Sequence, residues 1–175
     1  GQPLLQKLQI LVLGTHLRPP YAKLNPMLSA LWLALLLAAP AESHPNFSGS
    51  WELDLDRSKL EVPAPQATTL TIRHKDDDFH LLATHVYQDR SRTVTFHLPI
   101  DGKEQTIEED GLVQHLSLSW RGPALALQAW WLEGDVKSTN AAIYTISRDG
   151  KSLGIRETEN IRGRQFRNTW VFRRR

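Results

Sequence analysis

The sequence predicts an all-β protein, an antiparallel up-and-down meander of about ten strands closed into a barrel. From residue 46 onward, apolar and polar residues alternate with a period of two, which is typical of strands with one buried face. Short segments rich in turn-forming residues interrupt this alternation at close intervals. These connections leave no room for the crossover helices that parallel neighbours need. Each strand is therefore expected to pair antiparallel with its neighbour in the chain.

The alternation places the expected strands at residues 49–54, 68–74, 79–87, 92–98, 104–108, 112–120, 124–133, 139–147, 152–160 and 165–173. Asp-Gly steps lie in the connections at 101–103, 109–111 and 148–151, where they supply the positive φ of tight hairpins. Closing the sheet removes the two edges that an open ten-stranded sheet exposes. A two-sheet sandwich is the alternative, but the connections are local throughout and show no long Greek-key return.

Residues 1–41 are predicted to be a leader and signal peptide that is removed. From Leu28 to Ala39 every residue except Ser29 is apolar, and Pro40-Ala41 follows with the small residue that signal peptidase requires. A membrane-spanning helix needs about 20 apolar residues, and the run from Leu28 to Ala39 is too short for that. No stable membrane insertion of the mature chain is expected. Initiation at Met27 and a longer leader both give the same product. The expected mature chain is one domain, residues 42–175, secreted or periplasmic after cleavage behind Ala41.

Charge and cysteine content narrow the function classes. The three cations before residue 42 leave 18 Lys and Arg against 19 Asp and Glu in the predicted mature chain. Such a near-neutral body does not predict a surface that follows nucleic-acid phosphates. The chain has no Cys, so its stability has to come from a core rather than from disulfides.

The stretch "FSGSWEL" at 47–53 resembles the first-strand signature of the lipocalins and fatty-acid-binding proteins, the calycin superfamily, in which a Gly-x-Trp element opens the barrel. The resemblance implies that Trp51 plugs the closed end and that Gly49 lets the backbone bend around it. The longer stretch "FSGSWELDLDRSKL" with "PAP" at 63–65 is similar to bacterial exported lipocalin-like proteins of unknown function. Residues 55–67 are too few for the two-helix lid of fatty-acid-binding proteins, so the barrel mouth is expected to lack that lid.

Aromatic side chains gather in the last five strands and give the candidate ligand contacts Trp131, Tyr144 and Trp170. These rings either line an open lumen or fill a small barrel, and the sequence leaves both open. Arg156 is the candidate for an anionic head group, as interior arginines are in the fatty-acid-binding relatives, provided that it faces the lumen. Its alternative is an exposed cation paired with a neighbouring acid.

No catalytic residues, metal site or cofactor are predicted. The histidines after residue 42 show no ligand spacing with a clear third partner, and Glu108-Glu109-Asp110 abuts Gly111 as a solvated turn. The expected function is binding of a small, largely apolar ligand, with an anionic group as an option, by an exported barrel. An enzyme that uses the same cavity and a cavity-free structural or interaction domain of the cell envelope remain the alternatives. A cavity lined by convergent titratable groups would favour the enzyme, and a dry apolar cavity the binder.

Overall fold

The computed structural model describes residues 44–109 and 111–175, which form ten β-strands and no helix. The strands are β1 (Gly49–Leu53), β2 (Ala67–Lys75), β3 (Asp78–Val86), β4 (Ser91–Pro99), β5 (Gln105–Glu109), β6 (Leu112–Arg121), β7 (Ala124–Glu133), β8 (Val136–Ile146), β9 (Ser152–Ile161) and β10 (Arg164–Arg174). The ten predicted strands are confirmed. The largest difference at a boundary is in β8, which begins at Val136 rather than at residue 139.

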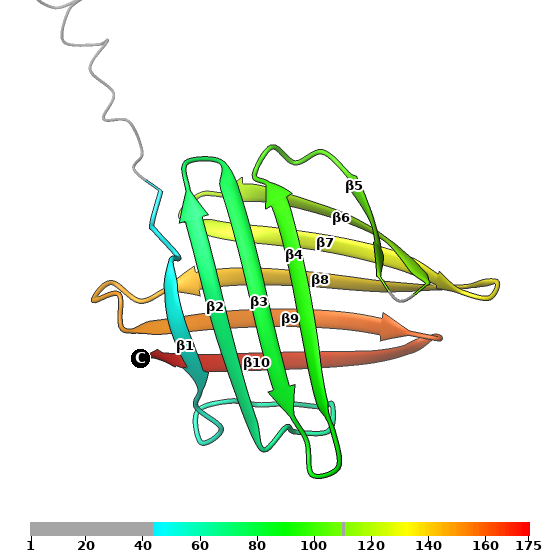
Figure 1. Cartoon of the computed structure of the whole chain (residues 1–175), viewed down its shortest axis with the longest axis horizontal. Coiled ribbons are helices and arrows are strands. Elements are labelled where there is room, and N and C mark those ends of the chain that lie inside the picture. The colour runs from blue at the N-terminus through cyan, green and yellow to red at the C-terminus, as the bar shows by residue number, and fades with distance from the viewer. Residues whose placement is uncertain (1–43, 110) are drawn as a thin grey trace, which may run out of the picture. The chain divides into compact units, whose positions relative to one another are not determined.

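The strands form one antiparallel sheet in the order β4-β3-β2-β1-β10-β9-β8-β7-β6-β5. Pairing of β1 with β10 joins the two ends of the meander, and Leu53 lies opposite Phe172. Figure 1 shows β1 to β4 as one layer that crosses the layer of β6 to β10. The predicted up-and-down barrel is therefore the observed architecture.

Closure of the barrel is nearly complete, and the gap lies between β4 and β5. These strands are consecutive in the chain but are not hydrogen-bonded neighbours. Backbone N–H groups of the connection between them bond elsewhere, Ile100 to the carbonyl of Asp77 at 2.8 Å and Gly102 to that of Leu118 at 2.9 Å. These bonds hold the connection against the β2–β3 turn and β6, so the expected removal of both sheet edges is only partly realised.

The closed end of the barrel is sealed by the segment that leads into β1. Phe47 and Trp51 are fully buried, and the Trp51 Nε1–H donates to the Phe47 carbonyl at 3.2 Å. The Arg174 guanidinium lies 4.3 Å from the centroid of the Trp51 ring, within the range of a cation–π contact. Gly49 adopts a φ of 149°, which side chains rarely tolerate, and a Cβ there would collide with that guanidinium. Glycine at 49 thus lets Arg174 cover the tryptophan.

Residues 54–66 form a loop between β1 and β2. The loop runs alongside β10, where Lys59 and Thr169 exchange backbone hydrogen bonds at 2.8 and 2.7 Å. Leu60 and Val62 pack against the core, and Pro65 is fully buried. The described part of this connection contains no helix, in agreement with the short spacing in the sequence.

The predicted leader, residues 1–41, and its cleavage site lie outside the described residues. Among the residues that the structure describes, no helix has the length and apolar character needed to span a membrane.

Candidate functional site

The interior of the barrel is apolar and sealed in its closed half. Alternation in each strand directs every second side chain inward, and the cross-strand register aligns these side chains in rows. The closed half is packed by residues that are at most 2% exposed: Phe47, Trp51, Phe79, Leu98, Leu118, Leu125, Leu153 and Phe172. This half provides a rigid floor.

The open half of the interior differs in both exposure and polarity. Many of its inward-facing side chains are only half-buried, among them Val94, Ile107, Trp131, Asn140, Glu157, Glu159 and Phe166. Because these inward-facing groups retain exposed area, solvent reaches this half of the barrel interior, whose wall carries both apolar rings and polar groups.

Two glutamates of β9 form the centre of an interior carboxylate cluster, defined here as Asn140, Glu157, Glu159, Asn168 and Trp170. Glu157 Oε2 accepts hydrogen bonds from Trp170 Nε1 at 2.8 Å and from Asn168 Nδ2 at 3.1 Å. Asn140 Nδ2 donates to Glu157 Oε1 at 2.7 Å and to Glu159 Oε1 at 3.2 Å. One asparagine thus bridges both carboxyl groups.

Register explains why these residues meet. Glu157 lies opposite Asn168 of β10, and Glu159 lies opposite Asn140 of β8, so each carboxyl group faces an amide across the sheet. The Asn168 Oδ1 atom in turn accepts the backbone N–H groups of Glu61 at 3.0 Å and Val62 at 3.4 Å. The cluster therefore fastens the 54–66 loop to the wall of the lumen.

The electrostatics of the lumen are set by burial and by the proximity of these charges. Burial raises the pKa of Glu159, the negative charge of Glu157 raises it further, and Asn140 and Arg92 act in the opposite direction. Across the lumen, burial lowers the pKa of His85, as does Arg92, whereas Glu157 raises it. Burial also raises the pKa of Tyr144. Burial therefore penalises charge of either sign in this region, and Glu157 adds a further cost for a second negative charge beside it.

Three of the predicted ligand contacts are inward-facing. Trp170 is 9% exposed and belongs to the carboxylate cluster. Tyr144 lies deeper, with its ring edge-on to Phe79 at a centroid distance of 6.2 Å. Trp131 is half-buried near the mouth and donates its Nε1–H to Glu133 Oε1 at 3.0 Å.

Arg156 lies exposed on the outer face of β9, on the opposite side from Glu157. The condition for its predicted role, a side chain directed into the lumen, is therefore not met. Its place in the alternation follows from Leu153 and Ile155, which are buried and thereby assign the odd-numbered residues of β9 to the inside. Arg156 is therefore not placed to bind an anionic head group inside the barrel.

Sequence reasoning did not single out Glu157, Glu159, Asn140 or Asn168. The signal was present in β9, because Leu153 and Ile155 share one face with Glu157. Assigning the inside by the apolar members of that face would have placed both glutamates in the lumen. Their asparagine partners depend on the register between strands, which the sequence pattern does not give.

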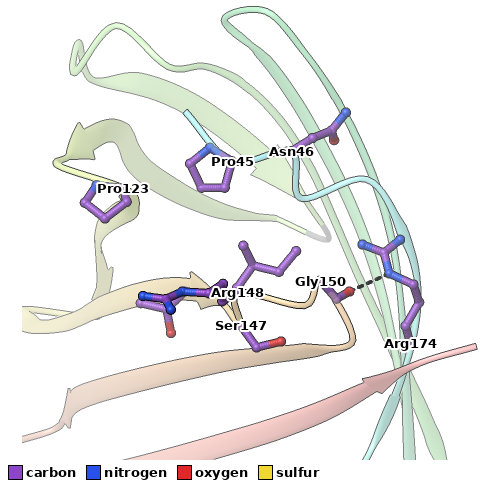
Figure 2. A pocket seen from close by; sticks show the side chains of 9 residues that line it. Pro45, Asn46, Pro123, Ser147, Arg148, Gly150 and Arg174 are labelled. Carbon is purple, nitrogen blue, oxygen red and sulfur yellow. Dashed lines mark hydrogen bonds between the residues drawn. The ribbon is translucent and has the colours of Figure 1, made fainter. Parts of the chain in front are cut away.

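Two pockets lie elsewhere on the barrel. A pocket of about 490 Å³ lies at the closed end, between the segment before β1, the β6–β7 and β8–β9 turns and Arg174 (Figure 2). There the Arg174 Nε–H donates to the Gly150 carbonyl at 2.8 Å. A second pocket, of about 400 Å³, lies on the outer face of β7 to β10, where its lining includes Arg121, Arg156 and Arg167.

Three side chains of types that can bind metals meet on the outer face of the β3–β4 hairpin. His80 and His97 are cross-strand partners whose rings stack at 3.7 Å, and both Nε2 atoms hydrogen-bond to the Asp78 carboxylate. Their ligand atoms lie within 4.8 Å of one another. The Asp78-x-His80 spacing was visible in the sequence, but its third member again depends on register. Hydrogen bonds within the group account for the arrangement, and the absence of a metal site stays a prediction.

Comparison with known proteins places this geometry in a known fold. No family model matches the chain, and no curated protein does. A secretory abundant heat soluble protein of Ramazzottius varieornatus is 15% identical with a TM-score of 0.55, and the match covers 77% of this chain and 98% of that one. Zebrafish ileal bile acid-binding protein, solved with cholic acid, is 17% identical with a TM-score of 0.50, over 74% of this chain and 98% of that one.

The fold is a calycin-like barrel. A second heat soluble protein of the same organism, number 4, agrees, with 16% identity and a TM-score of 0.52 over 77% of this chain and 99% of that one. The calycin-like architecture expected from "FSGSWEL" is therefore confirmed. At these identities the likeness concerns the fold, and the chemistry of the site has to be argued from the residues of this barrel itself.

Proposed function

We propose that this protein is exported and reversibly binds a small, largely apolar molecule in the open half of its calycin-like barrel. One observation carries the proposal: half-buried apolar side chains, among them Val94, Ile107, Trp131 and Phe166, face inward above a sealed floor. The complex of the zebrafish bile acid-binding protein with cholic acid supports it, since that barrel of the same fold holds a small molecule.

We expect a small apolar ligand to bind with modest affinity. Burying roughly 150–250 Å² of apolar ligand surface at about 25 cal/mol per Å² gives about 4–6 kcal/mol before the cost of immobilisation. Such a gain corresponds to micromolar dissociation constants at best, unless polar groups contribute. Without a helical lid, the ligand is expected to exchange readily.

Binding is tested with the neutral dye N-phenyl-1-naphthylamine, whose emission rises in apolar surroundings. Saturable enhancement is expected, together with a change in tryptophan emission because Trp131 and Trp170 line the accessible region. Ala129→Phe adds a ring to the inner face of β7 and should weaken dye binding at least about tenfold. Ala141→Phe, on the outer face of β8, is the matched control and should leave binding unchanged.

Circular dichroism and thermal unfolding establish that both variants are folded. Equal dye binding by wild type and Ala129→Phe would place the dye outside the lumen and contradict the proposal. A folded wild type that leaves the dye, retinol and long-chain alcohols unbound would favour the structural-domain alternative instead.

The convergence of Glu157 and Glu159 supports an enzyme as the second candidate function, because paired carboxyl groups can serve as general acid and base. We favour binding because Glu157 already accepts three hydrogen bonds within the barrel, which occupy the oxygens that a substrate would have to reach. Mass spectrometry of a recovered ligand separates the two candidates. Unchanged ligand after prolonged incubation supports binding, and conversion that depends on Glu159 supports the enzyme.

Export is tested on the chain expressed with its leader. The apolar run from Leu28 to Ala39 and the small residue Ala41 lead us to expect that the exported protein begins near Glu42. N-terminal sequencing of the exported fraction measures this directly. Retention of the whole leader on a cytoplasmic chain would contradict the export proposal and leave the binding proposal unaffected.

A further inference from the structure

Resting on the proposed binding function, we infer that the interior carboxylate cluster selects a ligand whose head group donates hydrogen bonds, with a primary ammonium group as the preferred chemistry. The cluster has more open hydrogen-bond acceptors than open donors, and the arginines of the outer face do not take part in it.

Most donors of the cluster are already engaged. Asn140 Nδ2 donates to both Glu157 and Glu159, and Trp170 donates its one N–H to Glu157. Asn168 donates one of its two Nδ2 hydrogens to Glu157. A ligand that offers only acceptors to the cluster would therefore compete with Glu157 for most of these N–H groups.

Acceptors, by contrast, remain open. Asn140 Oδ1 is buried and has no hydrogen-bond partner within the described residues. For Glu159 the hydrogen bonds in the described part of the chain involve Oε1, which leaves Oε2 available. Buried acceptors without partners are costly, and a donor supplied by a ligand would remove that cost. An ammonium group brings three donors to this place.

Charge points in the same direction. Glu157 and Glu159 lie two residues apart on the inner face of β9, and both accept a hydrogen bond from the Asn140 amide, so their negative charges lie close together. Facing them from other elements are Arg92 of β4 and His85 of β3, of which Arg92 partly compensates Glu159. His85 is bound through Nδ1 to Thr68 at 3.0 Å. A cation between the two carboxyl groups would relieve their repulsion, whereas a carboxylate would increase it.

The experiment compares three ligands that share a ten-carbon chain, decylamine, 1-decanol and decanoate, by displacement of N-phenyl-1-naphthylamine at pH 7.5. Alkylamines are protonated at this pH, as lysine is. We expect decylamine to bind at least about tenfold more tightly than decanoate, with decanol between them. Glu159→Gln should weaken decylamine at least about tenfold and leave decanol nearly unchanged.

Two controls test whether a change in amine binding comes from Glu159 itself. Glu108→Gln removes one negative charge on the exposed outer face of β5 and should leave all three affinities as in wild type. Glu159→Gln itself is expected to fold at least as well as wild type, because the new amide can donate to Asn140 Oδ1 and the charge that Glu157 repels is removed. Thermal unfolding measures this stability, so lost amine binding cannot be attributed to unfolding.

The pH dependence gives an independent readout. Since the pKa of Glu159 is raised, part of its population is protonated at a pH above the ordinary carboxyl range. Decylamine affinity should therefore rise between pH 4.5 and pH 7.5 as Glu159 loses its proton. Glu159→Gln should flatten this rise, and decanol affinity should vary little with pH in either protein.

The outcomes separate this inference from the proposed function. If decanol and decanoate bind as well as decylamine and Glu159→Gln changes none of them, the head-group inference is wrong and the binding function stands. If neither the dye nor any of the three ligands binds the folded protein, the binding function itself fails. Stronger binding of decanoate than of decylamine would also overturn the inference.

Discussion

Replacing Trp51 with alanine is expected to lower the free energy of unfolding by about 3–5 kcal/mol, the usual range for removing a core aromatic side chain. The ring is fully buried, donates to the Phe47 carbonyl at 3.2 Å and lies under the Arg174 guanidinium. Its loss would open a cavity at the closed end and leave the segment before β1 without its anchor. Urea unfolding of Trp51→Ala, followed by circular dichroism, measures the change.

Trp130→Ala is the matched control, because this tryptophan lies on the outer face of β7 and stacks on His115 at 3.8 Å. Its removal deletes the same side chain outside the core, and we expect a loss of about 1 kcal/mol. If Trp51→Ala cost less than about 1 kcal/mol, the side chain would not support the closed end of the barrel, and the role implied by the Gly-x-Trp motif would be lost.

The sheet was predictable because its signals are local. A period of two identifies each strand, and Asp-Gly or other short turns fix the antiparallel pairing of neighbours. Closure between β1 and β10 follows from the cost of exposed sheet edges, since these are the first and last strands. The gap between β4 and β5 was not predictable, because it depends on backbone hydrogen bonds of Ile100 and Gly102 to distant strands and turns.

The candidate site was predictable only in part. An aromatic, inward-facing Trp170 follows from alternation in β10, and the structure buries it as expected. Arg156 and Glu157 are adjacent in the chain, so assigning the wrong face of β9 exchanges a cation for an anion in the lumen. The sequence left that choice open, and the chemistry of the proposed ligand depends on it.

The interior carboxylate cluster links ligand chemistry to the stability of the barrel mouth. Asn168 donates a hydrogen bond to Glu157 and accepts hydrogen bonds from the backbone N–H groups of Glu61 and Val62. A ligand that binds at the carboxyl groups therefore contacts the same network that holds the 54–66 loop. Because buried polar networks are costly when only partly satisfied, a change at Asn168 should affect both.

Replacing Asn168 with alanine is expected to lower the free energy of unfolding by about 2–4 kcal/mol, since it leaves buried hydrogen-bonding groups without partners. Asn168 is 3% exposed, and its side chain makes the contacts to the loop and to Glu157 described above. Because the loop loses its acceptor, limited proteolysis should also cut within residues 54–66 faster than in wild type. Chemical unfolding and mass spectrometry of the cleavage products measure the two effects.

Asn160→Ala provides the comparison, because Asn160 is an exposed residue on the outer face of β9, and its removal should change stability by less than about 0.5 kcal/mol. Asn168→Asp separates the two halves of the network. An ionised aspartate can still accept hydrogen bonds from the loop N–H groups but cannot donate one to Glu157. The Asn168→Asp variant should therefore be less stable than wild type, and this difference should become smaller as the pH falls and the new carboxyl group takes up a proton. If Asn168→Ala unfolded and was cleaved like Asn160→Ala, the 54–66 loop would be held by its apolar contacts, and the lumen and the loop would be independent of each other.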